Sequence, residues 1–271
     1  PTFGDGFRYQ AAARALAQSG KSNQTAYVDF LYDITPPTST VSVPASGAFI
    51  KTLSSIEGTA VDPLSSVPNS NPFASGITGG GGVDIALRRN SDNAWWQGGA
   101  FGNVHVAPPG SVDWRPADCV GCGPGWRKTT GLPAAIDMSA GQHTLYSRAY
   151  DVARNTQTAL ATAGVFTWDV TGPIVVLSTP SGSAQRAYSS LALIGGTAQD
   201  ANNIAAIEYR VKKFDGTFWT GAGFGVMTWL PASTGTPVGN LLAWTTTYLP
   251  TFTEDSNETW EIDARALDVA G

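Results

Sequence analysis

Acidic and amide side chains at the ends of short apolar runs are the first candidates for chemistry in this chain. Asp33, Asp62 and Asp151 each follow such a run, and Asn155 lies four residues after Asp151. Carboxylate, amide and carbonyl oxygens are the ligands that Ca²⁺ prefers, six to eight at a time. The alternative is that each side chain caps its own tight turn through hydrogen bonds to nearby backbone N–H groups. These four residues are the candidate metal ligands, and the sequence suggests no cofactor other than Ca²⁺.

The only two cysteines, Cys119 and Cys122, have the spacing of a redox or zinc-binding pair. Glycines and a proline surround them, which predicts a loop and not the helix N-terminus that lowers a thiol pKa. One such pair also supplies only half of a tetrahedral zinc shell. A small disulfide that clamps the loop is favoured over free thiols, and it would suit an oxidising, extracellular setting.

The sequence contains no recognisable catalytic constellation. His105 and His143 are the only histidines, and neither belongs to a Ser-His-Asp pattern or to a metal-binding helix. General acid–base catalysis needs a partner held beside the titrating group. We therefore assign no catalytic residue, and we expect that the protein is not an enzyme.

The nine Trp residues permit two interpretations. Five of them, Trp95, Trp96, Trp219, Trp229 and Trp244, lie on or beside the predicted middle hairpins. An exposed aromatic row there would stack on sugar rings, which makes a glycan the first ligand to test. A Trp-x-Gly element recurs along the chain, however, and a repeated large apolar side chain is typical of a core position. Core packing is the preferred interpretation.

The composition excludes several classes of protein. The chain has 271 residues, of which 42% are hydrophobic and 14% charged, as expected for one or two globular domains. A net charge of −5 gives no basic surface for nucleic acid. No apolar run approaches the roughly 18 residues that span a bilayer, and the first residues lack signal-peptide features. We expect no membrane insertion, and a chain that is either mature or cut from something longer.

An internal repeat organises the sequence. Four segments reappear in the same order, and the last two pairs are closer together in sequence than the first two, which assigns the longer loops to the first copy. The pairs are Asp33-Ile-Thr-Pro-Pro37 with Asp169-Val-Thr-Gly-Pro173, Ile56-Glu-Gly-Thr-Ala-Val-Asp62 with Ile194-Gly-Gly-Thr-Ala-Gln-Asp200, Trp96-Gln-Gly-Gly-Ala-Phe-Gly102 with Trp219-Thr-Gly-Ala-Gly-Phe-Gly225, and Arg148-Ala-Tyr-Asp-Val-Ala153 with Arg265-Ala-Leu-Asp-Val-Ala270.

The first residues repeat the last part of the same unit. Arg14-Ala-Leu16 matches the Arg-Ala segment, and Tyr27-Val-Asp-Phe-Leu-Tyr-Asp33 parallels Val165-Phe-Thr-Trp-Asp169. The predicted domains are residues 1–32, the last two strands of a preceding repeat or a donor segment; residues 33–168, a domain with long loops; and residues 169–271, a domain that lacks its last strand.

Alternating apolar positions predict strands throughout, and Asp215-Gly216 predicts a tight hairpin. The pattern of short strands and turns resembles the bacterial Ig-like repeats of large secreted and cell-surface proteins, with Asp-x-Thr-x-Pro, Gly-Thr-Ala-x-Asp, Trp-x-Gly and Arg-Ala-x-Asp-x-Ala-Gly-Asn elements. In the first copy Arg154 occupies the usual Gly place of the last element. The resemblance implies an all-β fold of tandem immunoglobulin-like β-sandwiches, in which the loops that carry Asp33, Asp62, Asp151 and Asn155 share one end of the first sandwich.

The expected function is a non-enzymatic, extracellular structural segment of a bacterial surface stalk, fibre or adhesin, which supplies length and stiffness. Its expected partners are further repeats of the same chain or other copies of it, and strand complementation between chains is one route to a polymer. The alternative is a glycan- or protein-binding module of an adhesin or secreted enzyme, which would use the long loops of residues 63–82 and 101–131.

Overall fold

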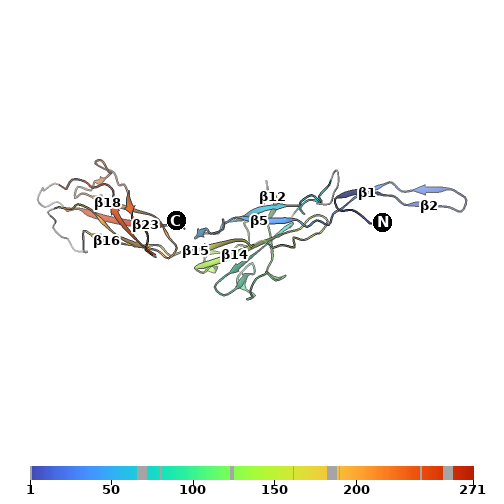
Figure 1. Cartoon of the computed structure of the whole chain (residues 1–271), viewed down its shortest axis with the longest axis horizontal. Coiled ribbons are helices and arrows are strands. Elements are labelled where there is room, and N and C mark those ends of the chain that lie inside the picture. The colour runs from blue at the N-terminus through green and yellow to red at the C-terminus, as the bar shows by residue number, and fades with distance from the viewer. Residues whose placement is uncertain are drawn as a thin grey trace. The chain divides into compact units, whose positions relative to one another are not determined.

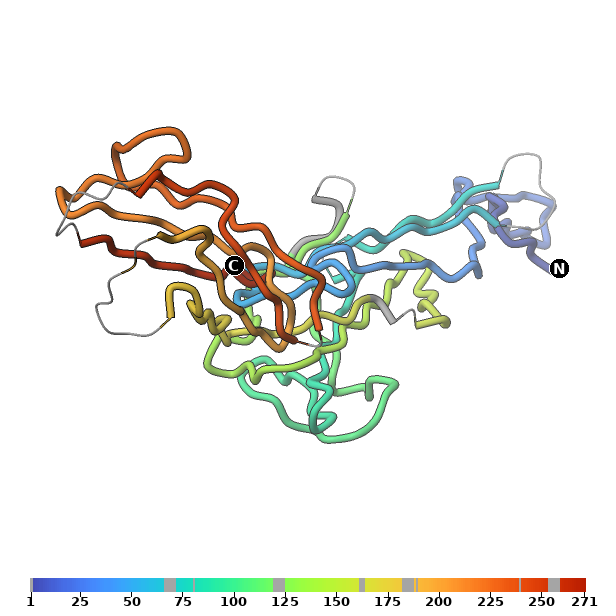
Figure 2. Tube along the Cα trace, turned by 60° about the vertical axis from the view of Figure 1, so that its left-hand side comes forward, coloured from blue at the N-terminus to red at the C-terminus, as the bar shows by residue number. Residues whose placement is uncertain are grey.

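The computed structural model describes residues 2–65, 72–79, 81–122, 125–160, 162–181, 188, 190–238, 240–252 and 259–271, without the side chains of residues 119–122, 162 and 163. The described part is all-β apart from one short 3₁₀-helix, Ala135–Asp137. No helix in it is long and apolar enough to cross a membrane. The chain forms two compact units, Pro1–Ala48 with Thr52–Trp168 and Phe49–Lys51 with Asp169–Gly271 (Figures 1 and 2).

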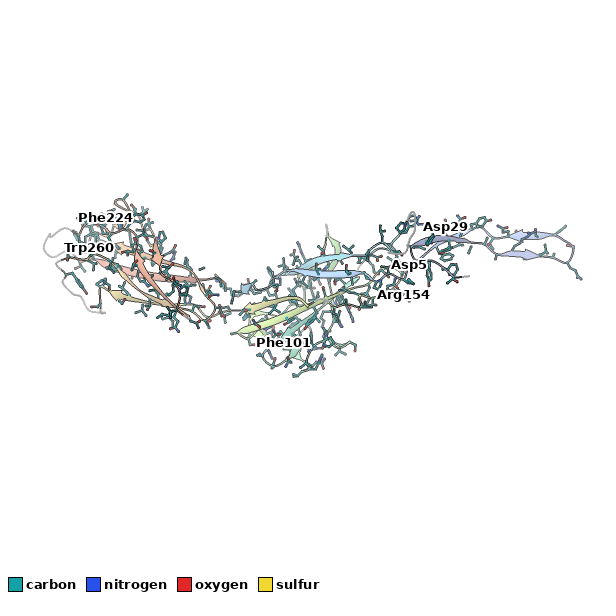
Figure 3. The ribbon with its side chains drawn as sticks, viewed as in Figure 1. Asp5, Asp29, Phe101, Arg154, Phe224 and Trp260 are labelled. Atoms are coloured by element: carbon teal, nitrogen blue, oxygen red, sulfur yellow. The ribbon has the colours of Figure 1, made fainter. Side chains whose placement is uncertain are left out.

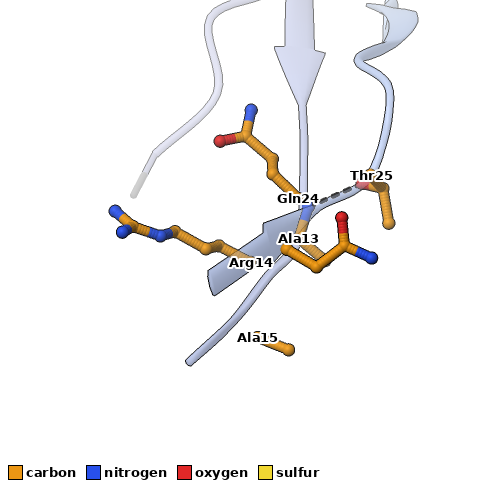
Figure 4. Close-up of a pocket in the computed structure, with 6 residues that line it drawn as sticks. Ala13, Arg14, Ala15, Gln24 and Thr25 are labelled. Atoms are coloured by element: carbon orange, nitrogen blue, oxygen red, sulfur yellow. Dashed lines mark hydrogen bonds between the residues drawn. The ribbon is translucent and has the colours of Figure 1, made fainter. Parts of the chain in front are cut away.

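A long β-hairpin opens the first unit (Figure 1). Its base pairs β1 (Phe7–Ala11) with β4 (Val28–Tyr32), and its tip pairs β2 (Arg14–Leu16) with β3 (Ser22–Gln24), both antiparallel. Ala13 and Thr25 connect the two halves, because the backbone N–H of Ala13 donates to Thr25 Oγ1 at 3.0 Å (Figure 4). The shallow hollow beside them is lined by small and polar residues and gathers no candidate chemistry. The two strands expected from the partial repeat are thus present, each in two segments.

Two facing sheets form the body of the first unit. One has the order β10-β9-β8-β14-β15, with β11 also paired to β8, and the other has the order β12-β13-β7-β5. β5 packs against β14 and β15, which gives the sandwich its two layers. The strands are β5 (Thr38–Val43), β7 (Ile56–Val61), β8 (Val83–Arg89), β9 (Ala94–Trp96), β10 (Phe101–Gly102), β11 (Arg115–Pro116), β12 (Cys119–Cys122), β13 (Gly125–Lys128), β14 (Gly141–Ala149) and β15 (Thr162–Trp168). The short strand β6 (Phe49–Ile50) belongs to the second unit.

Period-two patterning explains one face of β8 and not the other. Val83, Ile85 and Leu87 are buried as predicted, but Ala86 on the opposite face is buried too. That face packs in a second apolar cluster with Trp95. Both faces of β8 are therefore covered, because the long loops of the first copy lie over its outer side.

A glycine of the repeated Gly-Thr-Ala element is required by a close approach of two backbones. A Cβ on Gly58 would meet the backbone carbonyl oxygen of Thr40 at 1.9 Å, and one on Gly196 would meet that of Val176 at 1.8 Å. Neither contact is sterically possible. The repeat keeps glycine here because any side chain would push adjacent strands apart.

The second unit forms one curled sheet of eight strands. β21 pairs with both β22 and β18, so it joins what would otherwise be two layers, and β23 pairs with β18. The Asp215-Gly216 hairpin between β18 and β19 is confirmed. The strands are β16 (Ile174–Thr179), β17 (Gly195–Gln199), β18 (Ile204–Lys212), β19 (Phe218–Trp219), β20 (Phe224–Gly225), β21 (Leu230–Thr234), β22 (Leu241–Thr246) and β23 (Glu261–Asp268).

The cysteine segment differs from its predicted loop. Residues 119–122 form β12, which pairs antiparallel with β13 and carries a register shift between Val120 and Cys122. The glycines that predict a loop are accommodated by this irregular hairpin. The side chains of Cys119 and Cys122 lie outside the described residues, so their disulfide stays a prediction.

Candidate metal centre

Three strand ends bring the predicted carboxylates together in the first unit. Asp33 directly follows β4, Asp62 follows β7 and Asp151 follows β14. One carboxylate oxygen from each lies within 4.8 Å of those of the other two. Asp33 and Asp151 are buried, and Asp62 is partly buried. Three acidic side chains that are far apart in sequence thus share one small volume at one end of the sandwich.

Asp33 combines turn capping with a tertiary contact. Its Oδ1 accepts a hydrogen bond from the backbone N–H of Thr35 at 3.0 Å, which closes an Asx-turn. Its Oδ2 accepts a second one from the backbone N–H of Ser75 at 2.7 Å. The capping interpretation is therefore correct for one oxygen of Asp33, while the other oxygen holds a distant loop.

Asp62 is the least satisfied of the three carboxylates. Its Oδ2 accepts hydrogen bonds from the backbone N–H of Gly76 at 2.6 Å and from the hydroxyl of Ser75 at 3.3 Å. Its Oδ1 is buried and has no hydrogen-bond partner. Burial raises the pKa of Asp62 above its usual value, and repulsion from Asp33 and Asp151 adds to this effect, while the bond from Gly76 opposes it. A bare buried carboxylate oxygen is costly unless a cation or a proton compensates it.

Asn155 ties two of the carboxylate residues together. Its backbone N–H donates to Asp151 Oδ1 at 2.7 Å, and its Nδ2 donates to Asp151 Oδ2 at 2.7 Å and to the carbonyl oxygen of Asp33 at 3.0 Å. The sequence predicts Asn155 as an oxygen ligand. In this structure its backbone N–H and its Nδ2 are donors that fix Asp33 and Asp151, and its role as an oxygen ligand stays a prediction.

The loop of residues 72–79 supplies the donors that the sequence does not reveal. Ser75 and Gly76 bind Asp33 and Asp62, and the hydroxyl of Thr78 donates to the carbonyl oxygen of Asp151 at 2.6 Å. The only signal in the sequence is the Ser-Gly pair, which marks a turn. Gly76 has φ +86°, a conformation that glycine adopts without strain.

The base of the hairpin is attached to the same end of the sandwich. Asp5, which is 9% exposed, accepts hydrogen bonds from the backbone N–H of Ile34 at 2.8 Å and from the hydroxyl of Thr35 at 2.5 Å. The backbone N–H of Phe73 donates to the carbonyl oxygen of Gly6 at 3.0 Å, and the Arg8 guanidinium stacks on the Phe73 ring. Figure 3 labels Asp5 at the base of the hairpin and Arg154 in the loop that carries Asp151. The acidic cluster therefore lies where hairpin, linker and sandwich meet.

No protein-family model matches the chain, and no curated protein matches it in sequence. What the cluster does must be argued from its own chemistry. In the part of the chain that the structure describes, no lysine or arginine forms an ion pair with Asp33, Asp62 or Asp151. Oxygen donors without a basic partner match the ligands of a hard divalent cation, and Asp62 Oδ1 has the free lone pairs to contact one.

His143 and the tryptophans, which the sequence also singles out, have structural roles. His143 lies on β14 and is fully buried, and its ring packs against the rings of Phe101 and Phe166. Burial lowers the pKa of His143 below its usual value. Six of the nine Trp side chains are buried, and the other three, Trp219, Trp229 and Trp260, are partly buried. Core packing is therefore the main role of the tryptophans, and glycan binding stays a prediction.

The repeated arginine also has a structural role in each unit. Arg148 pairs with Asp84 at 2.8 Å and stacks on Trp114. Arg265 pairs with Glu208 at 2.6 Å and stacks on Trp229. The two positions make the same kind of contact, an ion pair across neighbouring strands combined with a cation–π contact.

Proposed function

We propose that the chain is a non-enzymatic structural segment built from tandem Ig-like β-sandwiches, and that it gives length and stiffness to a bacterial stalk, fibre or adhesin outside the cell. The observation that carries this proposal is the set of hydrogen bonds that attaches the base of the hairpin to the end of the first sandwich. Asp5 and Asp33 each hold two segments there through buried or partly buried carboxylates. Such a joint restrains bending, as a stiff spacer requires.

A divalent cation, with Ca²⁺ as the first choice, completes this joint in our proposal. Asp33, Asp62 and Asp151 would bind it through carboxylate oxygens, and Asn155 would hold Asp33 and Asp151 in place. The cation would neutralise three converging negative charges and link the linker after β4 to the ends of β7 and β14. The partners that suit this role are further repeats of the same chain or other copies of it.

The test is thermal unfolding of the full chain in EDTA and in excess Ca²⁺. At a ligand concentration of about one hundred times Kd, binding stabilises the folded state by about 2.7 kcal/mol, which shifts Tm by several degrees. We expect this shift in the natural sequence and not in Asp62→Asn. Asp215→Asn is the matched control, because Asp215 is an exposed turn carboxylate far from the cluster in sequence that accepts hydrogen bonds from Thr217 within its own turn. An equal Ca²⁺ shift in all three proteins would remove the cation from the proposal.

Stiffness is tested separately by ¹⁵N relaxation of backbone amides. Residues of β1 and β4 are expected to share the rotational correlation time of β14, which lies in the body of the first unit. Faster, independent tumbling of the hairpin with Ca²⁺ bound would contradict the stiffening role while leaving cation binding intact.

A further inference from the structure

The long loop after β10 is organised around a single buried carboxylate. Asp113 is fully buried, and it accepts hydrogen bonds from Asn103 Nδ2 at 2.6 Å, from the backbone N–H of Gly110 at 2.6 Å and from Gln97 Nε2 at 3.1 Å. His105 Nε2 lies 2.8 Å from the same carboxylate. Four donors spread over residues 97–110 therefore converge on one side chain, and the conformation of the loop depends on them.

His105 has acceptors on both sides of its ring. Its Nδ1 lies 2.8 Å from the carbonyl oxygen of Val106, and its Nε2 lies 2.8 Å from Asp113 Oδ2. A carbonyl oxygen and a carboxylate oxygen only accept hydrogen bonds. A neutral imidazole carries one N–H, so it can satisfy one of these contacts and sets a lone pair against the other. Only the doubly protonated ring makes both bonds.

The ring also closes one side of the apolar cluster. It stacks on Trp95 with ring centroids 5.2 Å apart, and the Trp95 indole N–H donates to the His105 carbonyl oxygen at 3.0 Å. Trp95 is fully buried. Movement of His105 would therefore uncover a core tryptophan.

Charged groups around the ring favour its cationic form on balance. Asp113 contacts it directly, Arg88 on β8 opposes it, and Arg115 on β11 binds the neighbouring Gln97. The hydrogen bond to the Val106 carbonyl is the largest influence; together with Asp113 it outweighs desolvation and Arg88, so the pKa of His105 is raised above its usual 6.5.

We propose that the loop of residues 103–113 is a proton-controlled element, held in the observed conformation by the doubly protonated ring of His105 and released when that ring loses a proton. The ordered loop presents three exposed valines, Val104, Val106 and Val112. Release would remove this fixed apolar surface and free the Asp113 carboxylate from one of its four donors. The device is independent of the acidic cluster and of the structural role proposed above.

The raised pKa of His105 determines the direction in which pH changes the stability of the loop. The folded state binds this proton more tightly than the unfolded state, so the stabilisation is complete below pH 6.5 and is lost as the pH rises through the folded pKa. The order of the loop should therefore decrease between about pH 6.5 and the pH at which His105 titrates.

The experiment is an NMR titration of the full chain combined with amide hydrogen exchange. Imidazole ¹⁵N shifts should show both ring nitrogens of His105 protonated at pH 6, with a pKa above 6.5. Exchange of residues 103–113, corrected for its intrinsic pH dependence, should accelerate as the pH rises from 6.5 to that pKa and then level off. Each unit by which the pKa exceeds 6.5 corresponds to about a tenfold loss of protection.

His105→Gln assigns the effect to the ring. Glutamine can donate to Asp113 but does not titrate, so the step in exchange should be absent in this variant while the exchange of β14 amides stays unchanged. A His105 pKa at or below 6.5 would overturn the proposal, and so would hydrogen exchange of residues 103–113 without a pH-dependent rise in the natural sequence. Both results can be obtained without the variant. A step of equal size in His105→Gln would overturn it as well.

Discussion

The two units carry the same three aspartates in the same order, yet in the described part of the chain only the first unit gathers them. Asp169, Asp200 and Asp268 occupy the repeat positions of Asp33, Asp62 and Asp151, and their oxygens do not form a comparable group. Asp169 and Asp200 instead cap turns, accepting from Thr171 and Asn202. The same residue types therefore cap turns in both units, and in the described residues they form a cluster only in the first.

The difference lies in the loop that follows the second aspartate. Three residues separate Asp200 from β18, whereas residues 63–82 separate Asp62 from β8. Part of that longer loop returns to donate hydrogen bonds from Ser75 and Gly76. The repeated motif therefore supplies the charges, and the longer loop of the first unit supplies the donors that hold them close together.

The largest expected contrast is between Asp151→Ala and Asp268→Ala. Asp151 is 1% exposed and accepts two hydrogen bonds from Asn155, so its removal leaves buried donors unpaired and deletes a proposed ligand. We expect a loss of about 2–3 kcal/mol of unfolding free energy in Ca²⁺-containing buffer. Asp268 has a buried oxygen without a partner, so its removal should cost less than about 1 kcal/mol. Urea denaturation of both variants checks this, and equal losses would contradict the comparison.

The second contrast concerns His143 and its repeat counterpart Trp260. Burial lowers the pKa of His143, so the unfolded state binds the proton more tightly and stability is lost as the pH falls from about 6.5 through the folded pKa. The loss should reach about 1.4 kcal/mol per pH unit in that window. His143→Phe should remove this slope, as the non-titrating tryptophan does in the second unit. Urea midpoints measured between pH 7 and pH 4 test it, with Trp260→Phe as the control that leaves the slope unchanged.

A smaller difference in unfolding free energy is expected between variants of Asp62 and Asp200 in the absence of metal. The pKa of Asp62 is raised, so its ionised form opposes folding, and lowering the pH from 7 should stabilise this part of the metal-free protein. In EDTA at pH 7, Asp62→Asn should therefore gain about 1 kcal/mol, whereas Asp200→Asn should gain nothing because the Asp200 carboxylate accepts from Asn202 outside any acidic group. Destabilisation by Asp62→Asn in EDTA would show that the three carboxylates do not repel one another.

The smallest effect concerns the backbone of the loop after β14. Arg154 has φ +73°, and Gly271 at the matching place of the second copy has φ +85°. A side chain in this conformation costs about 1 kcal/mol, which glycine avoids. Arg154→Gly should raise the unfolding free energy by about 0.5–1 kcal/mol, while Ala153→Gly next to it should lower it. Chemical denaturation of the Arg154→Gly and Ala153→Gly variants tests whether the positive φ at residue 154 explains the glycine that the motif usually has there.

Period-two patterning and turn residues were sufficient to predict most strands, including Ile207, Tyr209 and Val211 on one buried face of β18. They also placed Asp33, Asp62 and Asp151 at strand ends. Sequence could not reveal Asp5, whose partners lie 29 and 30 residues further along the chain. It could not reveal Ser75 and Gly76 either, because a donor in a long loop has no periodicity. In the second unit, β21 joins two layers into one sheet through short pairings with β18 and β22. Such short pairings leave no periodic pattern in the sequence.

The clamp at Asp5 has a mechanical consequence. Because Asp5 bonds to residues 34 and 35, tension that enters through the residues before Asp5 passes directly to the linker and bypasses the hairpin. When those bonds and then the strand pairings of the hairpin rupture, 29 peptide steps become available to extend, roughly 100 Å of contour length. In a protein tethered at both ends, this segment would lengthen under tension as the hairpin unpairs.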